Sequence, residues 1–171
     1  MVMRVLGESM NTLVVYYSRT GTTRKVATTL ANRFACDVEE VIDTVNRHGV
    51  LGRLRAGRDA KLKRLTTLHP VRYDPSMYDL VVIGTPVWNF TVSPPIRTYL
   101  TLYGDRMHDA AFVTTQGGVS VHYAAAEMRQ LCANASWLHL NVIQKDVEAN
   151  RHTSDVEQFI EAVRSHLDHP E

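Results

Sequence analysis

The sequence predicts an α/β fold, in which a doubly wound parallel sheet carries helices on both faces in three layers. Short apolar segments rich in β-branched residues alternate with segments of helical periodicity from end to end. No repeat or low-complexity tract interrupts this alternation. The length of 171 residues favours one domain, which we assign to residues 11–171. Residues 1–10 are assigned to an N-terminal extension, because the strand-like pattern begins after Met10.

Three strands and the helix after the first of them are predicted in the first half of the chain. Residues 12–17 (TLVVYY) carry no charge and suit a strand buried on both faces. A second strand over residues 36–43 contains acids and is expected to be less buried, and a central strand over residues 78–86 stops at Gly84 and Pro86. The helix after the first strand is predicted by an apolar stripe that consists of Val26, Ala27, Leu30 and Phe34.

The second half continues the alternation. A helix follows for which Ser93 offers the N-cap, Pro94 the first helical position and Gly104 the C-terminal end. A buried strand is predicted over residues 110–115, and the last strand over residues 136–144. The helix between these two strands has an apolar side made of Val121, Ala124, Ala125, Met128 and Leu131.

The final helix is expected to start at Ser154, with Glu157 three residues later completing a capping box. Its apolar stripe consists of Val156, Phe159, Ile160, Val163 and Leu167.

A basic segment lies between the second and third strands, with six Lys or Arg residues and a single acid in residues 53–64. One helical face can hold Leu51, Leu54, Leu62 and Leu65, with Arg58 in its middle. The favoured interpretation is an amphipathic crossover helix whose arginine lies across the sheet edge with its head in water. The alternative is a docking patch for an acidic partner or a phosphorylated cosubstrate.

The composition excludes several classes of protein. A formal charge of +1 provides no basic field for nucleic acid. No apolar run approaches the roughly 20 residues that span a membrane, and none resembles a signal peptide. The two cysteines, Cys36 and Cys132, have no metal-ligand or CxxC spacing, so reduced thiols in the cytoplasm are expected. The histidines are scattered and predict no metal site.

Polar, irregular stretches follow three of the predicted strands, at residues 18–23, 85–93 and 115–120. In a doubly wound sheet, ligands bind beyond the carboxyl ends of the strands. The first stretch, SRTGTT, enters a helix whose N-terminal N–H groups favour a phosphate, and Gly21 lets the backbone approach it closely. Further donors are the hydroxyl groups of Ser18, Thr20, Thr22 and Thr23.

This first stretch lacks the lysine of the GxxxxGK[ST] pattern and is not GxGxxG, so nucleoside triphosphates and dinucleotides fit it poorly. One terminal phosphate monoester suits it better, although an ordinary turn with a threonine cap is the simpler alternative.

In the second stretch, Trp88 and Phe90 either close over the core or stack on a planar ligand. In the third, Gly117 and Gly118 allow hydrogen bonds to the edge of a heterocycle. Together the three stretches describe a phosphorylated planar cofactor, and flavin mononucleotide (FMN) fits this description.

Three motifs, YYSRTGTT, IGTPVWNFTVSPPIRTYL and FVTTQGG, make the chain similar to the flavodoxin-like family over nearly all of residues 11–168. The resemblance implies a five-stranded parallel sheet of order 2-1-3-4-5 and one non-covalent FMN. It implies that the phosphate is held by Ser18, Arg19, Thr20, Gly21, Thr22 and Thr23. The residues that it places along the isoalloxazine ring and the ribityl chain are Pro86, Val87, Trp88, Asn89 and Phe90. The residues that it places at the other edge of the flavin are Thr115, Gln116, Gly117 and Gly118.

The resemblance implies an FMN-binding redox protein, which acts as an electron carrier or a small FMN-dependent oxidoreductase. The partner is a redox protein or a small acceptor such as a quinone. Electron-carrier flavodoxins are usually strongly acidic, whereas this chain is near neutral. The alternative function is an NAD(P)H-dependent quinone reductase, in which His122 and Tyr123 could donate hydrogen bonds to the acceptor. The simpler interpretation places both in the first turn of a helix, with Tyr123 half buried. A third hypothesis, a non-redox interaction module, is disfavoured by the intact phosphate loop.

Overall fold

The computed structural model describes residues 11–118, 120–132 and 134–168, apart from the side chains of Trp137 and Asp168. The expected N-terminal extension, residues 1–10, and the last three residues of the assigned domain lie outside this part. The strands are β1 (Thr12–Tyr16), β2 (Asp37–Glu40), β3 (Leu80–Trp88), β4 (Thr91–Val92), β5 (Ala110–Gln116) and β6 (Ala135–Ile143). The α-helices are α1 (Thr22–Phe34), α2 (Gly49–Lys61), α3 (Pro94–Tyr103), α4 (His122–Gln130), α5 (Gln144–Glu148) and α6 (Thr153–Asp168). Short 3-10 helices cover η1 (Pro75–Met77) and η2 (Gly104–Arg106).

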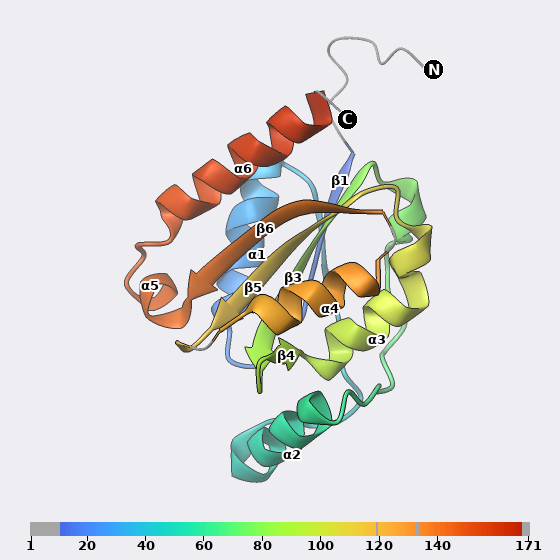
Figure 1. Cartoon of the computed structure of the whole chain (residues 1–171), viewed down its shortest axis with the longest axis vertical. Coiled ribbons are helices and arrows are strands. Elements are labelled where there is room, and N and C mark those ends of the chain that lie inside the picture. The colour runs from blue at the N-terminus through green and yellow to red at the C-terminus, as the bar shows by residue number, and fades with distance from the viewer. Residues whose placement is uncertain (1–10, 119, 133, 169–171) are drawn as a thin grey trace.

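The five long strands form a parallel sheet in the order β2-β1-β3-β5-β6, which confirms the predicted order 2-1-3-4-5. The sheet lies between two helical layers, with α1 and α6 on one face and α3 and α4 on the other (Figure 1). A sixth strand, β4, is not part of the predicted sheet and pairs antiparallel with the end of β3. All parallel strands therefore end at one edge of the molecule.

Two apolar layers hold the sheet and its helices together, because the central strands are buried on both faces. The layer beneath α1 and α6 includes Val14, Val26, Leu30, Val82, Phe159 and Ile160. The layer beneath α3 and α4 includes Leu13, Ile83, Ile96, Tyr99, Phe112 and Met128. The predicted stripes of the first and last helices thus form the interior of one layer.

Helix and strand ends differ from the predictions at several points. The strand predicted to end at Pro86 continues to Trp88, because a two-residue turn at Asn89 and Phe90 brings β4 back against it. Both turn residues have positive φ values, 46° and 66°, as a type I′ hairpin requires. Ser93 does lie at the N-cap of α3, but its hydroxyl bonds with Thr85 Oγ1 at 2.9 Å and does not cap the helix.

Two helices at the C-terminal end of the chain were predicted incompletely. α5 is short and follows β6 directly, where no helix was expected. α6 begins at Thr153, so Ser154 lies inside the first turn and is not the N-cap. The amide of Val156 bonds instead to the carbonyl of His152 at 3.1 Å.

The largest difference concerns α2, which forms in the basic segment but does not bury the predicted leucine face. Leu51 is 81% exposed and Leu54 is 67% exposed, and Leu62 and Leu65 are exposed as well. The residues that α2 buries are Gly52, Ala56, Asp59 and Ala60. α2 lies beyond the carboxyl ends of the strands and does not cover the sheet (Figure 1).

No helix in the described residues is both long and apolar enough to cross a membrane. Within the same residues, no cluster of three or more His, Cys, Asp or Glu side chains could hold a metal ion. Cys36 and Cys132 are free thiols, and burial raises the pKa of each to about 11, so both are protonated at neutral pH.

His139 on β6 gives the fold a pH dependence. Its Nε2 lies 2.8 Å from Thr114 Oγ1, and burial, with the charges of Arg129 and His122, lowers its pKa to about 4. The unfolded chain binds a proton near pH 6.5 that the folded chain does not, so stability is present above pH 6.5 and falls between pH 6.5 and 4. We expect His139→Gln to lose less stability between pH 7 and pH 4.5 than the wild type in urea unfolding. Equal losses in the two proteins would contradict this assignment.

Candidate functional site

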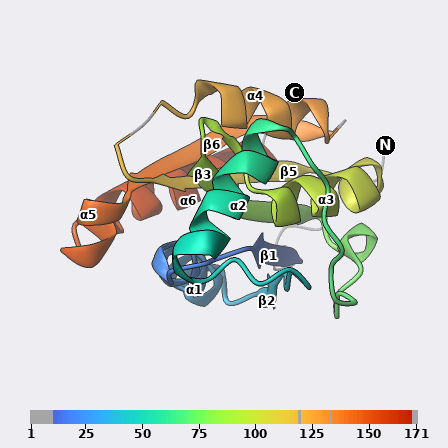
Figure 2. The ribbon, with the colours of Figure 1, turned by 90° about the horizontal axis from the view of Figure 1, so that it is seen from below.

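A cavity of about 520 Å³ opens at the carboxyl ends of the strands. Its walls come from five segments that are far apart in the sequence: the loop after β1 with the start of α1, helix α2, the β3–β4 hairpin, the end of β5 and the start of α5. Figure 2 looks at this edge of the molecule and shows α2 in front of β3. The position is the one at which ligands bind in open α/β sheets.

The loop after β1 leaves the N-terminus of α1 open to an anion. Gly21 is the N-cap residue with a φ of 96°, a conformation that glycine adopts without strain. No described side chain caps the helix, and its first turn contains no acid. The hydroxyl of Ser18 accepts a hydrogen bond from the Gly21 N–H at 3.1 Å and so fixes the loop. The free N–H groups of the first turn therefore favour a phosphate.

Three threonines lie beside this helix N-terminus, two with hydroxyls available at the cavity and one bonded to β5. Thr20 is exposed, Thr22 is half-buried, and both line the cavity. Thr23 is buried, and its hydroxyl forms a 2.7 Å hydrogen bond with the hydroxyl of Thr115 on β5. This bond links the predicted phosphate loop to the third predicted loop, whereas the hydroxyls of Thr20 and Thr22 have no hydrogen-bond partner in the described chain.

Trp88 forms an aromatic wall of the cavity. Because it is the last residue of β3, its backbone is held by the pairing with Thr91 on β4. The ring of Tyr17 meets the indole edge-on, with 5.7 Å between ring centres and an angle of 87°. Burial, together with the negative charge of Asp43, raises the pKa of Tyr17 to about 12, so it stays neutral. The indole is thus presented in a fixed orientation.

The side chain of Arg19 lies over the indole of Trp88, with its guanidinium carbon 5.2 Å from the ring centre. This is the geometry of a cation–π contact. A planar ligand that stacks on this face of Trp88 would have to displace the guanidinium. Arg19 therefore connects the phosphate loop with the aromatic wall.

The hairpin and the third loop complete the side of the cavity that the sheet supplies. Asn89 donates its side-chain amide to the carbonyl of Gly57 on α2 at 2.6 Å. Phe90 is 49% exposed and is not part of the cavity lining. At the end of β5, Gln116 Oε1 accepts a hydrogen bond from the Gly118 N–H, and Gln116 and Gly117 line the cavity.

Helix α2 forms the wall that the sequence did not predict. Val50, Arg53, Leu54 and Arg58 line the cavity together with Ala56 and Gly57. Gln144 at the start of α5 is a further lining residue. The lining contains three arginines and, among the residues that the structure describes, no carboxylate. An alternation of leucine and arginine was the only signal for this wall, and it equally suits a solvent-facing helix.

Polar bonds attach α2 to the rest of the protein, in addition to the burial of its small residues. The buried Arg47 donates to Asp43 at 2.5 Å and to Asp59 on α2 at 2.8 Å. Gly52 packs so closely on Arg47 that a Cβ there would lie 2.3 Å from the Arg47 carbonyl carbon. Arg97 on α3 donates to the carbonyl of Ala60 at 3.4 Å. These contacts hold α2 over the strand ends.

The structure brings together most of the predicted site residues. Those that line the cavity are Arg19, Thr20, Thr22, Thr23, Pro86, Val87, Trp88, Asn89, Thr115, Gln116 and Gly117. Ser18 and Gly21 line a second cavity of about 500 Å³, which shares Arg19 and Thr20 with the first. Phe90 and Gly118 belong to neither lining. His122 and Tyr123 do lie in the first turn of α4, but Tyr123 is exposed and not half buried.

The donor set fits a planar group that carries one phosphate. The open end of α1 supplies N–H groups and hydroxyls, and Trp88 supplies a flat apolar surface. The polar end of β5 lies across the same cavity. Each of the three parts was predicted from a separate loop, and the fold places them around one space.

Comparison with known proteins gives a consistent result. A family model described as flavodoxin matches residues 58–161, which is more than half of the chain. The match includes the second and third loops and begins after the phosphate loop. A search of curated protein sequences gave no match.

Several solved structures share the fold. A flavoprotein from Lactobacillus acidophilus NCFM, in complex with FMN, has 22% identity and a TM-score of 0.65 over 83% of this chain and 97% of its own. A putative flavoprotein from Bacteroides uniformis ATCC 8492 has 22% identity and a TM-score of 0.67 over 90% and 99%. A flavodoxin, WrbA-like protein from Agrobacterium tumefaciens has 15% identity and a TM-score of 0.56 over 91% and 99%.

Proposed function

The chain belongs to the flavodoxin family, and on this basis we propose that it is an FMN-dependent redox protein that acts as an electron carrier or a small oxidoreductase. FMN is the cofactor. The observation that carries the proposal is the cavity in which the uncapped N-terminus of α1 and the indole of Trp88 meet. A phosphate and a flat ring system can occupy these two positions at the same time.

The protein's own residues bind and orient the cofactor. The N–H groups at the start of α1 and the hydroxyls of Thr20 and Thr22 hold the phosphate. Trp88 orients the ring, and the end of β5 with Gln116 and Gly117 provides polar contacts at its edge. When bound, FMN supplies the capacity to accept and donate electrons, so no side chain needs to act as a nucleophile or base.

A second candidate is an NAD(P)H-dependent quinone reductase. The observation that favours it is the set of three arginines in the cavity lining, Arg19, Arg53 and Arg58, which suits a phosphate-bearing nucleotide. Steady-state NAD(P)H oxidation with a quinone separates the two candidates. Turnover without an added reductase would support the reductase, and turnover that requires one would support the carrier.

The assignment of FMN is tested by the visible spectrum of purified protein. We expect a flavin spectrum, or its appearance after incubation with FMN. Protein that stays colourless after this treatment would instead support the interaction module.

We also propose that the protein resides in the cytoplasm, where its two free thiols remain reduced.

The phosphate site is tested by Thr20→Ala. Loss of one hydrogen bond to a charged group is expected to weaken FMN binding by about 1 kcal/mol or more, that is, at least about fivefold. The dissociation constant is measured by quenching of FMN fluorescence. Thr29→Ala is the matched control, because the Thr29 hydroxyl bonds to the Lys25 carbonyl further along α1 and does not line the cavity. Equal affinities of the two variants would contradict the phosphate assignment.

A further inference from the structure

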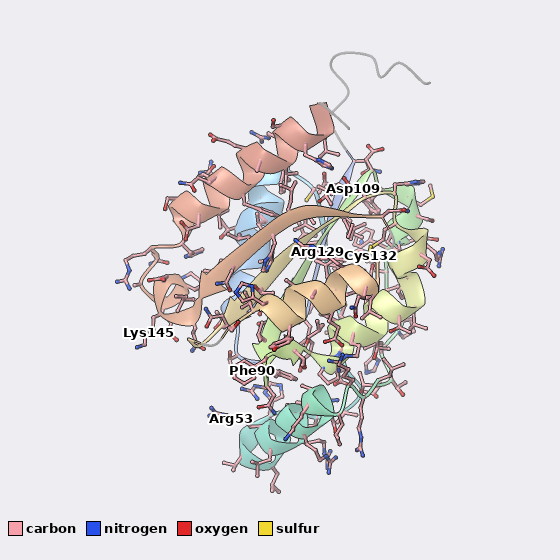
Figure 3. The ribbon with its side chains drawn as sticks, in the orientation of Figure 1. Arg53, Phe90, Asp109, Arg129, Cys132 and Lys145 are labelled. Atoms are coloured by element: carbon pink, nitrogen blue, oxygen red, sulfur yellow. The ribbon has the colours of Figure 1, made fainter. Side chains whose placement is uncertain are left out.

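The wall of the cavity that α2 supplies carries positive charge that was not assigned to the cofactor phosphate. Arg19, Arg53 and Arg58 line the cavity, and no carboxylate of the described chain does. Arg58 is close to Asp59, with 3.2 Å between Nη2 and Oδ1. Arg53 has no ion-pair or hydrogen-bond partner within residues 11–118, 120–132 and 134–168. It projects from α2 on the side of the β3–β4 hairpin, where Phe90 lies (Figure 3).

Arg53 and Arg19 both line the cavity, one from α2 and the other from the loop after β1. Burial, followed by the charge of Arg53, lowers the pKa of Arg19. Two like charges in one concave site raise the local concentration of anions and favour a ligand that neutralises them. The cofactor phosphate is expected at the N-terminus of α1, so Arg53 remains available for a different anionic group.

The surroundings of Arg53 indicate the shape of that ligand. Val50 and Leu54, which lie one helical turn apart on α2, line the same wall, and both are largely exposed. Trp88 lies on the wall that the hairpin contributes. A cation between apolar residues suits a flat molecule with an acidic group at one end.

We propose that Arg53, assisted by Arg19, binds the carboxylate, sulfonate or phosphate of a planar second substrate that exchanges electrons with the flavin. The inference rests on the proposed function, because it requires FMN in the same cavity. In the case of a quinone acceptor, reduced FMN gives up two electrons and two protons, and the quinone takes them up to become a hydroquinone. The acidic group of the substrate does not react and serves to position the ring.

The experiment measures equilibrium binding to FMN-saturated protein. The probe is naphthalene-2-sulfonate, which is planar, anionic and not reducible by the flavin, and its binding is followed by the change in flavin absorbance. We expect R53Q to raise the dissociation constant about tenfold, as for loss of one charge-assisted hydrogen bond. R53K keeps the charge and is expected to fall between R53Q and the wild type.

R55Q is the matched control. Arg55 is an exposed arginine on the same helix that does not line the cavity, and its replacement changes the net charge equally. We expect R55Q to bind the probe within about twofold of the wild type. Equal losses in R53Q and R55Q would overturn the proposal and point to docking of an acidic protein on the outer face of α2. Unchanged binding in R53Q would overturn it as well.

Two rates identify where the anionic group resides. One is reduction of the bound flavin by NADPH, and the other is oxidation of the reduced protein by 1,4-naphthoquinone-2-sulfonate. A tenfold fall of the first rate in R53Q assigns the group to the electron donor, and a fall of the second assigns it to the acceptor. Failure of the proposed function itself would be detected separately, because the wild-type protein would then bind no FMN before any probe is added.

Discussion

Replacement of Arg97 by methionine is expected to lower the free energy of unfolding by about 3–5 kcal/mol. The guanidinium is almost fully buried, and its Nε donates to Glu127 on α4 at 2.6 Å. Removal of the arginine leaves the Glu127 carboxylate buried without its partner, and the cost of this unpaired charge exceeds that of the lost packing. Urea unfolding at pH 7 measures the change.

Arg97→Met is expected to destabilise β4 as well as α4, because Arg97 Nη2 also donates to the carbonyl of Val92 on β4 at 2.9 Å. The matched control is Arg106→Met. Arg106 pairs with Asp74, and the two side chains are 47% and 44% exposed, so the cost of its replacement is expected to be far smaller than that of Arg97→Met. Similar losses in both variants would show that burial of the Arg97 pair does not govern its contribution. A double variant that also replaces Glu127 by leucine should recover most of the loss.

Replacement of Trp88 by alanine is expected to weaken FMN binding by about 1–3 kcal/mol, the range seen when an aromatic side chain stacked on a nucleic-acid base is removed. The indole lines the cavity and is held in place by β4 and by Tyr17. The absorbance spectrum and reduction potential of the bound flavin should change as well, because the aromatic wall of the cavity is lost. Fluorescence titration and anaerobic potentiometry measure these effects.

The control for Trp88→Ala is Tyr123→Ala. Tyr123 is 73% exposed and does not line the cavity, so its removal should leave the affinity for FMN unchanged. An unaltered flavin spectrum in the Trp88 variant would place the isoalloxazine ring elsewhere in the protein.

The sheet and most of the candidate site could be predicted because the signals lie in single segments. The uncharged run TLVVYY indicates a buried strand by itself, and a polar stretch directly after such a strand lies at the ligand-binding edge. The flavodoxin family assignment confirms the resemblance that the three motifs indicated.

The hairpin and the role of α2 could not be predicted because they depend on distant contacts. Nothing in the sequence near Trp88 specifies that Thr91 returns to pair with it, since Phe90 is an unusual residue for a turn position with positive φ. On α2, the leucine pattern predicted the wrong buried face. The helix is held instead by Arg47 and Arg97, which lie outside it in the sequence and bind Asp59 and the Ala60 carbonyl.

The way in which α2 is attached separates substrate selection from folding. Its anchoring face consists of small residues and Asp59, whereas Val50, Leu54 and Arg53 on the cavity wall contribute nothing to the two apolar layers of the sheet. Mutations at these three positions can therefore accumulate with little cost in stability. Related proteins could thus diverge in the molecules they accept while the sheet and the phosphate loop stay the same.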